Sequence, residues 1–438
     1  MIKVTKFGGS SLASAEQFKK VADIVKSDKD RRFVIASAPG KRNSADTKVT
    51  DMLYGCCELA RQGKPFDGAL EQIRGRFEEI ASGLGIEFDL QSEFDEIAKQ
   101  LEKPQKDYMA SRGEHLNSKI LAKYLGFEFV EAADCVLFDE NGKYMQEESN
   151  LLLAQRLESV KYAVIPGFYG AKADGTIKTF SRGGSDVTGS IVARAVSADI
   201  YENWTDVSGV FAADPRIVKN PRVISRVTYS ELRELSYMGA SVLHEDAVFP
   251  VRRAGIPINI RNTNCPEAEG TMIVSELPQG AKRHVITGIA GRKGFSTVLV
   301  EKAMMNAETG FGAALLKIFA DNGVSFEHVP SGIDTMSVVV STEGFNPVRE
   351  KVIETIQNEL KPDNISTEDG IALIAVVGHR MASAKGVAAK ICSAISKSDI
   401  NIRMIDQGPS ELNMIFGIDA ENYETAIRGI YEEIKDLI

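Results

Sequence analysis

The sequence KFGGSS, Lys6 to Ser11, comes directly after an apolar-alternating segment at the start of the chain. Such alternation predicts a strand. Two glycines after a strand let backbone N–H groups approach an anion, and a following helix points its positive end at it. Ser14 is placed to cap a helix over 15–25, where apolar residues recur at helical spacing. The stretch therefore predicts either a phosphate-binding turn, with Lys6 supplying charge, or only a tight turn.

The glycine stretch has the spacing of neither a P-loop nor a dinucleotide-binding fingerprint, so it does not define a fold alone. β-rich apolar runs alternate with helical stretches along the first part of the chain. These runs lie at 31–38, 127–138, 162–170, 197–210 and 257–262. The alternation predicts βαβ units around a largely parallel sheet with helices on both faces. The mainly helical segment 66–124 is expected to be a lid or an inserted arm.

The 438 residues carry a formal net charge of −9. This balance disfavours nucleic acid or an anionic membrane as a partner, because both reward a basic surface. No apolar run approaches the about 20 residues that span a bilayer, and no signal peptide is evident, so we expect a cytoplasmic protein. The cysteines have the spacing of neither a disulfide framework nor a metal site. They are Cys56, Cys57, Cys135, Cys265 and Cys392.

The segment 277–285 combines Pro278 and Gly280 with charge, which indicates a domain boundary between 1–280 and 281–438. Beyond it the chain repeats itself. Gly310 corresponds to Gly386 and Val324 to Ile400, and both pairs lie 76 positions apart.

Each copy is predicted to contain strands and two helices. The first copy, about 295–367, ends on a fourth strand, whereas the second, about 368–437, ends on its helix. Because open sheet edges promote aggregation, we expect the isolated strand 284–291 to complete the second copy. The first copy would then be inserted inside the second.

Three further stretches contain candidate functional residues. FSRGGSD, residues 180–186, is a second glycine turn before a helix, in which Asp186 either belongs to an anion site or only caps the helix. TDVSGVFAADPR, residues 205–216, ends a strand and carries a guanidinium suited to phosphate, or is a surface loop with a salt bridge. SRGE, residues 111–114, is predicted to start a helix, where Glu114 could simply favour the helix dipole.

Together, KFGGSS, SRGE, PGFYG (166–170), SRGGSD, TDVSGVFAADPR and the tandem C-terminal modules resemble aspartate kinases in type, order and approximate spacing. The resemblance covers essentially the whole chain. It implies an α/β fold: a carbamate-kinase-like amino acid kinase domain, an α/β/α sandwich, followed by two ferredoxin-like ACT domains. It further implies that ATP, with Mg²⁺, phosphorylates the side-chain carboxylate of L-aspartate on the way to lysine, threonine and methionine.

The same resemblance assigns residue roles. It puts Lys6 and Asp186 at the catalytic centre. The residues implied around aspartate are Thr50, Glu114, Arg182 and Ser185. Those implied around ATP are Lys6, Phe7, Gly8, Gly9, Thr205, Asp206, Phe211 and Arg216. The chain departs from many relatives at Ser11, at Phe211 in place of a tyrosine, and at Asn264 in place of a lysine near the nucleotide.

These roles suit the chemistry. Phosphoryl transfer mainly requires positioning and charge neutralisation, which Lys6 and the two glycine turns can supply. A carboxylate nucleophile needs no strong base. Glu114 suits an ammonium group, and Arg182 suits a carboxylate.

The ACT modules imply an amino-acid effector and a homodimer or homotetramer formed through them. The candidate effector residues are Met305, Gly310, Ser325, Phe326, Glu327 and Asp334. Two acidic residues favour lysine over threonine as the effector. Alternatively, Glu327 and Asp334 are solvated surface charges.

Two other functions compete with this interpretation. A catalytically silent amino-acid sensor is disfavoured by the joint presence of Lys6, Glu114, Arg182 and Asp186. Another kinase of the same fold, acting on glutamate, carbamate or UMP, is disfavoured by the paired ACT modules and the SRGE stretch.

Overall fold

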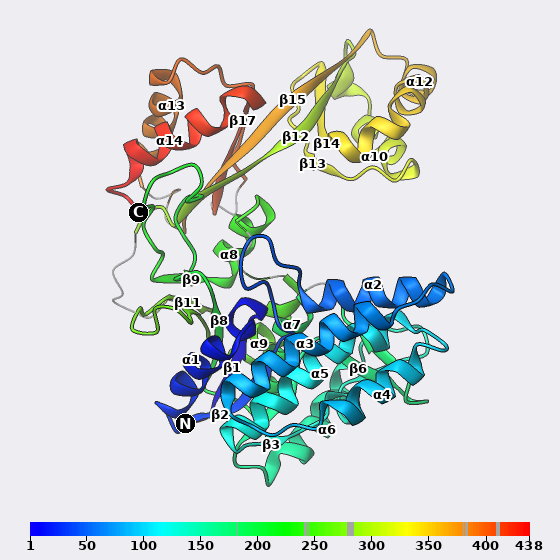
Figure 1. The fold of residues 1–438 in the computed structure, drawn as a ribbon. Helices are drawn as coiled ribbons and strands as arrows, with labels where there is room; N and C mark the ends of the chain where they lie inside the picture. Colours follow the sequence, from blue (N-terminus) through cyan, green and yellow to red (C-terminus); the bar gives the residue numbers. More distant parts are fainter. Residues whose placement is uncertain are drawn as a thin grey trace. The chain divides into compact units, whose positions relative to one another are not determined.

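The computed structural model describes residues 1–181, 183–240, 243, 245–277, 284–379, 381, 384–408 and 412–438. The chain forms two compact units, each described by itself below (Figure 1). The first contains Met1–Val210, Val223–Tyr229 and Val242–Gln279. The second contains Phe211–Arg222, Ser230–Ser241 and Gly280–Ile438. Two segments that precede residue 280 therefore belong with the C-terminal part.

An eight-stranded sheet forms the centre of the first unit. Its strand order is β3 (Glu128–Phe129), β5 (Ala163–Pro166), β2 (Arg31–Ala36), β1 (Lys3–Phe7), β8 (Ile200–Thr205), β10 (Ile258–Asn262), β11 (Thr271–Val274) and β9 (Arg226–Thr228). All neighbours are parallel except β10 and β11. A smaller sheet contains β4 (Leu137–Phe138), β6 (Tyr169–Lys172) and β7 (Ile177–Thr179). The predicted, largely parallel sheet is confirmed.

Helices cover both faces of the large sheet (Figure 1). Successive side chains of a strand point to opposite faces. Phe7 of β1 packs into the apolar core formed with helices α1 to α5, whereas Lys6 meets Asp186 of α7. The helices are α1 (Ala15–Lys26), α2 (Val49–Arg61), α3 (Asp67–Leu84), α4 (Leu90–Gln100), α5 (Lys106–Leu125), α6 (Gln146–Glu158), α7 (Gly184–Ala195) and α9 (Glu245–Ala254), with the 3-10 turns η1 (Gly9–Leu12) and η2 (Ala132–Asp134). From Ser230 on, α8 (Tyr229–Tyr237) belongs to the second unit.

The segment 66–124 belongs to this core. Ile73 and Phe77 of α3, Phe94 of α4 and Leu116 of α5 are buried in the same cluster as Phe7. The expectation of a separate arm or lid is therefore wrong, because these helices bury apolar stripes directly against α1, α2 and the sheet.

A six-stranded antiparallel sheet forms the centre of the second unit (Figure 1). Its strand order is β13 (Phe326–His328), β14 (Thr335–Ser341), β12 (Gly288–Glu301), β15 (Asn364–Val377), β17 (Asn413–Asp419) and β16 (Met404–Asp406). Its helices are α10 (Phe311–Asp321), α11 (Thr342–Phe345), α12 (Arg349–Leu360), α13 (Val387–Lys397) and α14 (Tyr423–Ile434), with η3 (Met305–Ala307), η4 (Asn346–Val348) and η5 (Ala420–Asn422).

The predicted edge strand lies where it was expected. Gly288 to Ala290 pair with Val377 to Ala375 of β15, and this part of β15 pairs in turn with β17. The start of β12 therefore completes the second module, and the pairing prediction is confirmed. β12 and β15 each continue into the first module and so join the strands of both modules into one sheet, which the sequence did not predict.

In the part of the chain that the structure describes, no helix is long and apolar enough to span a membrane.

Candidate active site

The KFGGSS stretch forms the predicted strand–turn–helix unit. β1 ends at Phe7, the Gly8 N–H donates to the Trp204 carbonyl at 3.0 Å, and η1 begins at Gly9. A Cβ on Gly9 would lie 2.9 Å from the carbonyl oxygen of Ala38, so this position excludes a side chain. Ser14 caps α1 by accepting from the Gln17 N–H at 3.4 Å. The turn thus holds two glycines at the carboxyl end of a central strand, where parallel α/β sheets bind ligands.

Lys6 and Asp186 form an ion pair in this region. Lys6 Nζ lies 2.5 Å from Asp186 Oδ1, and only 8% of Lys6 is exposed. Asp186 lies in the first turn of α7, behind Gly183, whose φ of 57° suits glycine. Asp186 is not the cap of this helix, because Gly183 is the N-cap residue and no side-chain hydrogen bond caps α7. Asp186 Oδ1 instead also accepts from Asn203 Nδ2 at 2.8 Å. The two glycine turns therefore bring together the two residues that were predicted to be catalytic.

Asn203 was missed at the sequence level. It lies on β8 directly opposite Lys6 of β1 in the parallel register. The available signal was a polar residue within two positions of the end of each of two predicted strands.

Glu114 lies in the middle of α5. The prediction that it lies in the first turn of a helix is wrong, because α5 starts at Lys106, soon after Pro104. Its side chain is buried, at 5% exposure, and Oε2 has no hydrogen-bond partner. Burial raises the pKa of Glu114 to about 8, against a smaller lowering by the Ala38 backbone amide. A buried, incompletely hydrogen-bonded carboxylate is a strong candidate for binding a cation.

Two of the other residues predicted around aspartate each lie at the start of a helix. Thr50 is the second residue of α2 and half-buried, and Ser185 lies buried in the first turn of α7. A Cβ on Gly167, in the PGFYG stretch, would lie 2.6 Å from Ser185 Oγ, so this glycine permits close contact with α7. Arg182 lies outside the described residues.

The predicted nucleotide residues are divided between the two units. Thr205 ends β8, its hydroxyl donates to Asp206 Oδ1 at 3.2 Å, and its carbonyl accepts from the Thr263 N–H. Thr263 Oγ1 in turn lies 2.8 Å from Ser11 Oγ. These contacts gather Thr205 and Asp206 at the same sheet edge as the first glycine turn.

Phe211 and Arg216 belong to the second unit. Arg216 is 85% exposed at its side chain and pairs with Asp214 at 2.6 Å, as in the salt-bridged loop considered above. Asn264, the position where a lysine was expected in relatives, accepts from Lys20 Nζ at 2.8 Å. The side chain of Lys20, which was not predicted, therefore places its own ammonium group beside Asn264.

The predicted effector residues cluster in the first ACT-like half of the second unit. Met305 lies buried in η3, Gly310 precedes α10 with φ of 90°, and Ser325 and Phe326 are exposed. Glu327 lies 3.6 Å from Arg292 Nη2 and accepts from the Tyr237 hydroxyl at 2.5 Å. Asp334 Oδ1 accepts from the Met304 N–H at 2.9 Å. Neither carboxylate is simply solvated, because each has a defined partner.

Among the described residues, no group of three or more His, Cys, Asp and Glu side chains could hold a metal ion.

The fold is an α/β domain with two glycine turns that lead into helical segments, followed by a six-stranded antiparallel sheet. Residues 1–262 match the amino acid kinase family, and residues 374–434 match the ACT domain. Aspartokinase 3 of Bacillus subtilis (strain 168) is 40% identical over 99% of this chain and 98% of that protein. The chain belongs to the amino acid kinase family and, within it, to the aspartokinases.

Two solved structures resemble the whole chain. The aspartate kinase of Clostridium acetobutylicum is 50% identical and superposes with a TM-score of 0.89, covering 99% of both chains. Aspartokinase III of E. coli, in complex with aspartate and ADP, is 25% identical with a TM-score of 0.76, covering 99% of this chain and all of that one. The predicted family and fold class are thereby confirmed.

Proposed function

We propose that the chain transfers the γ-phosphoryl group of ATP to the side-chain carboxylate of L-aspartate, giving 4-phospho-L-aspartate and ADP. The observation that carries this proposal is the ion pair between Lys6, at the carboxyl end of a parallel strand, and Asp186, in the first turn of α7 after the second glycine turn. Support comes from the aspartokinase relatives and from the complex of the E. coli enzyme with aspartate and ADP.

Lys6 has the central electrostatic role in this mechanism. The transferred group spreads negative charge over its oxygens, and a fixed ammonium group stabilises that charge without reorganising. Asp186 and Asn203 orient the ammonium: Asp186 pairs with it, and Asn203 holds the Asp186 carboxylate. The N–H groups of the glycine turns add further donors for phosphate oxygens.

The acceptor carboxylate of aspartate is ionised at neutral pH, so the site needs no strong general base. Glu114 receives the substrate ammonium, which would compensate its buried charge. Arg182 and Ser185 hold the substrate carboxylate, and Thr50 lines the same site, as the family resemblance implies.

Mg²⁺ is proposed to accompany ATP. It prefers oxygen ligands and keeps several waters, and the carboxylates of Asp186 and Asp206 are suitable donors. When bound, it would neutralise phosphate charge. Gly8, Gly9 and Thr205 are proposed to contact the nucleotide, together with Phe211 and Arg216. The side chain of Phe7 is fully buried in the apolar core, so Phe7 is proposed to contribute only through its backbone.

We further propose that residues 1–280 are catalytic and residues 281–438 regulatory, with ACT modules at about 295–367 and at 368–437 plus 284–291. Lysine is the proposed effector, supported by the 25% identical E. coli relative named lysine-sensitive aspartokinase 3. Assembly as a homodimer or homotetramer through the ACT modules, a cytoplasmic location, and the absence of nucleic-acid or membrane partners remain predictions.

An ADP-release assay with L-aspartate and L-glutamate side by side tests the activity. We expect turnover with aspartate, and loss of nearly all kcat in Lys6→Ala and Asp186→Ala, because both groups act on charge in the transition state. Lys19→Ala, which removes an exposed lysine of α1, is the matched control. Turnover with glutamate but not with aspartate would show that the substrate is glutamate instead of aspartate. No turnover with either substrate would favour the silent sensor.

A further inference from the structure

Three arginine side chains are at least nine-tenths buried in the described part of the chain: Arg31, Arg76 and Arg112. Arg31 pairs with Glu202 at 2.8 Å, and Arg76 pairs with Asp46 at 3.0 Å. Arg112, at 9% exposure, has no carboxylate partner among the described residues. A buried charge without a counter-ion is costly, so Arg112 differs from the other two in a way that needs an explanation.

The partners of Arg112 are a hydroxyl group and two aromatic rings. Its Nε and Nη2 donate to Ser111 Oγ at 3.2 and 3.0 Å. The guanidinium carbon lies 4.5 Å from the ring centroid of Tyr108 and 5.7 Å from that of Tyr169. Stacking holds the guanidinium in place without neutralising it. Ser111 accepts from two of the five guanidinium N–H groups and the Tyr108 side chain forms a further hydrogen bond, which leaves about two N–H groups for a ligand.

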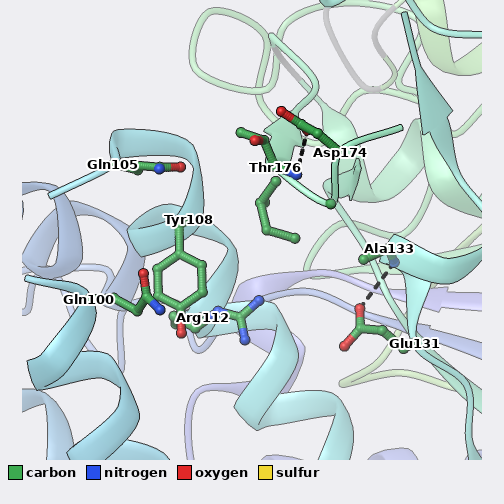
Figure 2. A pocket seen from close by; sticks show the side chains of 10 residues that line it. Gln100, Gln105, Tyr108, Arg112, Glu131, Ala133, Asp174 and Thr176 are labelled. Carbon is green, nitrogen blue, oxygen red and sulfur yellow. Dashed lines mark hydrogen bonds between the residues drawn. The ribbon is translucent and has the colours of Figure 1, made fainter. Parts of the chain in front are cut away.

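Arg112 lines a pocket of about 420 Å³ (Figure 2). The walls come from the end of α4, the start of α5, the loop around Glu131 and the β6–β7 turn. The lining residues are Gln100, Gln105, Tyr108, Arg112, Glu131, Ala133, Asp174, Gly175, Thr176 and Ile177. In Figure 2 the guanidinium of Arg112 extends from α5 toward the side of the pocket where Glu131 lies. A pocket of this size accommodates a small molecule.

Glu131 supplies the opposite charge in this pocket. Its Oε1 accepts from the Tyr169 hydroxyl at 2.6 Å and from the Ala133 N–H at 3.1 Å, and its Oε2 lies 2.8 Å from His115 Nδ1. Burial raises the pKa of Glu131, but the bonds from His115 and Tyr169 outweigh it and bring the pKa to about 2. An ionised carboxylate has about four lone-pair positions, so one position on Oε2 stays open.

We propose that this pocket binds a small α-amino acid, whose carboxylate pairs with Arg112 and whose ammonium group faces Glu131. The ligand would neutralise Arg112, and the amide and hydroxyl groups of Gln100, Gln105 and Thr176 would contact its polar side chain. A simple anion could pair with Arg112, but the Glu131 carboxylate would repel it and would itself remain without a cationic partner.

This site is separate from the proposed aspartate site. Arg112 and Glu114 are two residues apart on α5, which is about 200° around the helix axis, so their side chains leave the helix on different faces. It is also separate in sequence from the effector residues 305–334. The proposal therefore goes beyond the proposed function and does not depend on it.

Calorimetric titration of the full chain with each of the twenty L-amino acids tests this site. Succinate, putrescine and inorganic phosphate serve as ligands that carry one sign of charge only. The titration is repeated on three variants: Arg112→Gln, Gln105→Trp and Arg156→Gln. Gln105→Trp changes an exposed lining residue, so the larger side chain fills the pocket while Arg112 is kept. Arg156 is an exposed arginine paired with Glu128 and provides the matched control.

We expect at least one amino acid to bind wild type and Arg156→Gln alike, and to bind Arg112→Gln and Gln105→Trp about 10- to 100-fold more weakly, as for loss of hydrogen bonds to a charged group. The same binding should persist in Glu114→Gln and Asp334→Ala, which separates it from the other two proposed amino-acid sites. Equal affinities in wild type, Arg112→Gln and Gln105→Trp would overturn the proposal. Arg112-dependent binding of phosphate or succinate alone would also overturn it.

Discussion

Glu114→Gln should make the stability of the enzyme less dependent on pH. Without substrate, the Glu114 carboxylate is buried with one oxygen unpaired, and burial raises its pKa from 4.5 to about 8. Between these two values the folded protein keeps a proton that the unfolded chain has released. Stability therefore falls as pH rises through this window and levels off above it.

The size of this effect follows from the shift in pKa. Each unit corresponds to about 1.4 kcal/mol, so Glu114 costs about 2 kcal/mol at pH 6 and about 5 kcal/mol at pH 9. Glutamine occupies nearly the same volume and does not titrate. The variant should thus gain about 3 kcal/mol relative to wild type between pH 6 and pH 9.

Urea denaturation of both proteins at pH 6 and pH 9, without aspartate, measures this difference. Other titrating groups contribute equally to both proteins and cancel in the comparison. Glu71→Gln, which changes an exposed glutamate of α3, is the matched control and should follow wild type. A difference between Glu114→Gln and wild type that does not change with pH would refute the reasoning. In the kinetic assay the same variant should have a raised KM for aspartate, with a smaller change for ATP.

Three further predictions concern the phosphate turn, a buried ion pair and the effector. Gly9→Ala should raise the KM for ATP by roughly tenfold or more, since its Cβ would lie 2.9 Å from a carbonyl oxygen. Gly55→Ala on α2, where a Cβ meets nothing within 4 Å, should change no kinetic constant; equal effects would contradict the turn assignment. Arg76→Gln should cost about 1–3 kcal/mol in urea denaturation, because it removes the buried bonds to Asp46 and the Gly40 carbonyl while Asp46 keeps Arg42; a loss near zero would show that water replaces them. Lysine should inhibit the wild type at millimolar concentration and inhibit Asp334→Ala at least tenfold more weakly, whereas inhibition by threonine alone would rule out lysine.

Local signals predicted the first glycine turn and its surroundings. The strand before Lys6, the cap at Ser14 and the second turn at Gly183 are all short-range features, and the structure has each of them. The second turn follows β7 of the small sheet, not a strand of the large sheet, so local signals predicted each turn but not the contact between Lys6 and Asp186. The family resemblance, rather than the local pattern, placed these two residues together.

The start of α5 could not be predicted in the same way. Fourteen of its twenty residues are buried, so it lacks the one-sided apolar pattern that marks the ends of a surface helix. The SRGE stretch therefore resembled a helix start although it lies inside the helix.

The continuity of β12 was also hidden. The strand 284–291 and the first copy from about 295 were predicted as separate elements. Gly291 nevertheless lies where a Cβ would come within 2.6 Å of the Leu373 carbonyl, and pairing continues past Gly294 with shifted register. Glycine can mark close backbone contact as well as a turn. The sequence also could not show that Arg112 lacks a carboxylate partner, because the partners of a buried charge come from elements far apart in sequence.

The strands β12 and β15, which both modules share, determine the order in which the two modules of the second unit fold. In the inner module Phe295 pairs with Ser341 and Glu301 with Thr335, whereas in the outer module Gly288 pairs with Val377. The chain segment between Gly288 and Val377 is the longer loop, so closing it costs more chain entropy, and strand pairings distant in sequence form late. The inner module, once folded, holds the ends of β12 and β15 side by side and so shortens the search for the outer pairing. On a ribosome the inner module can fold first, and the outer sheet closes only after β17 has been made.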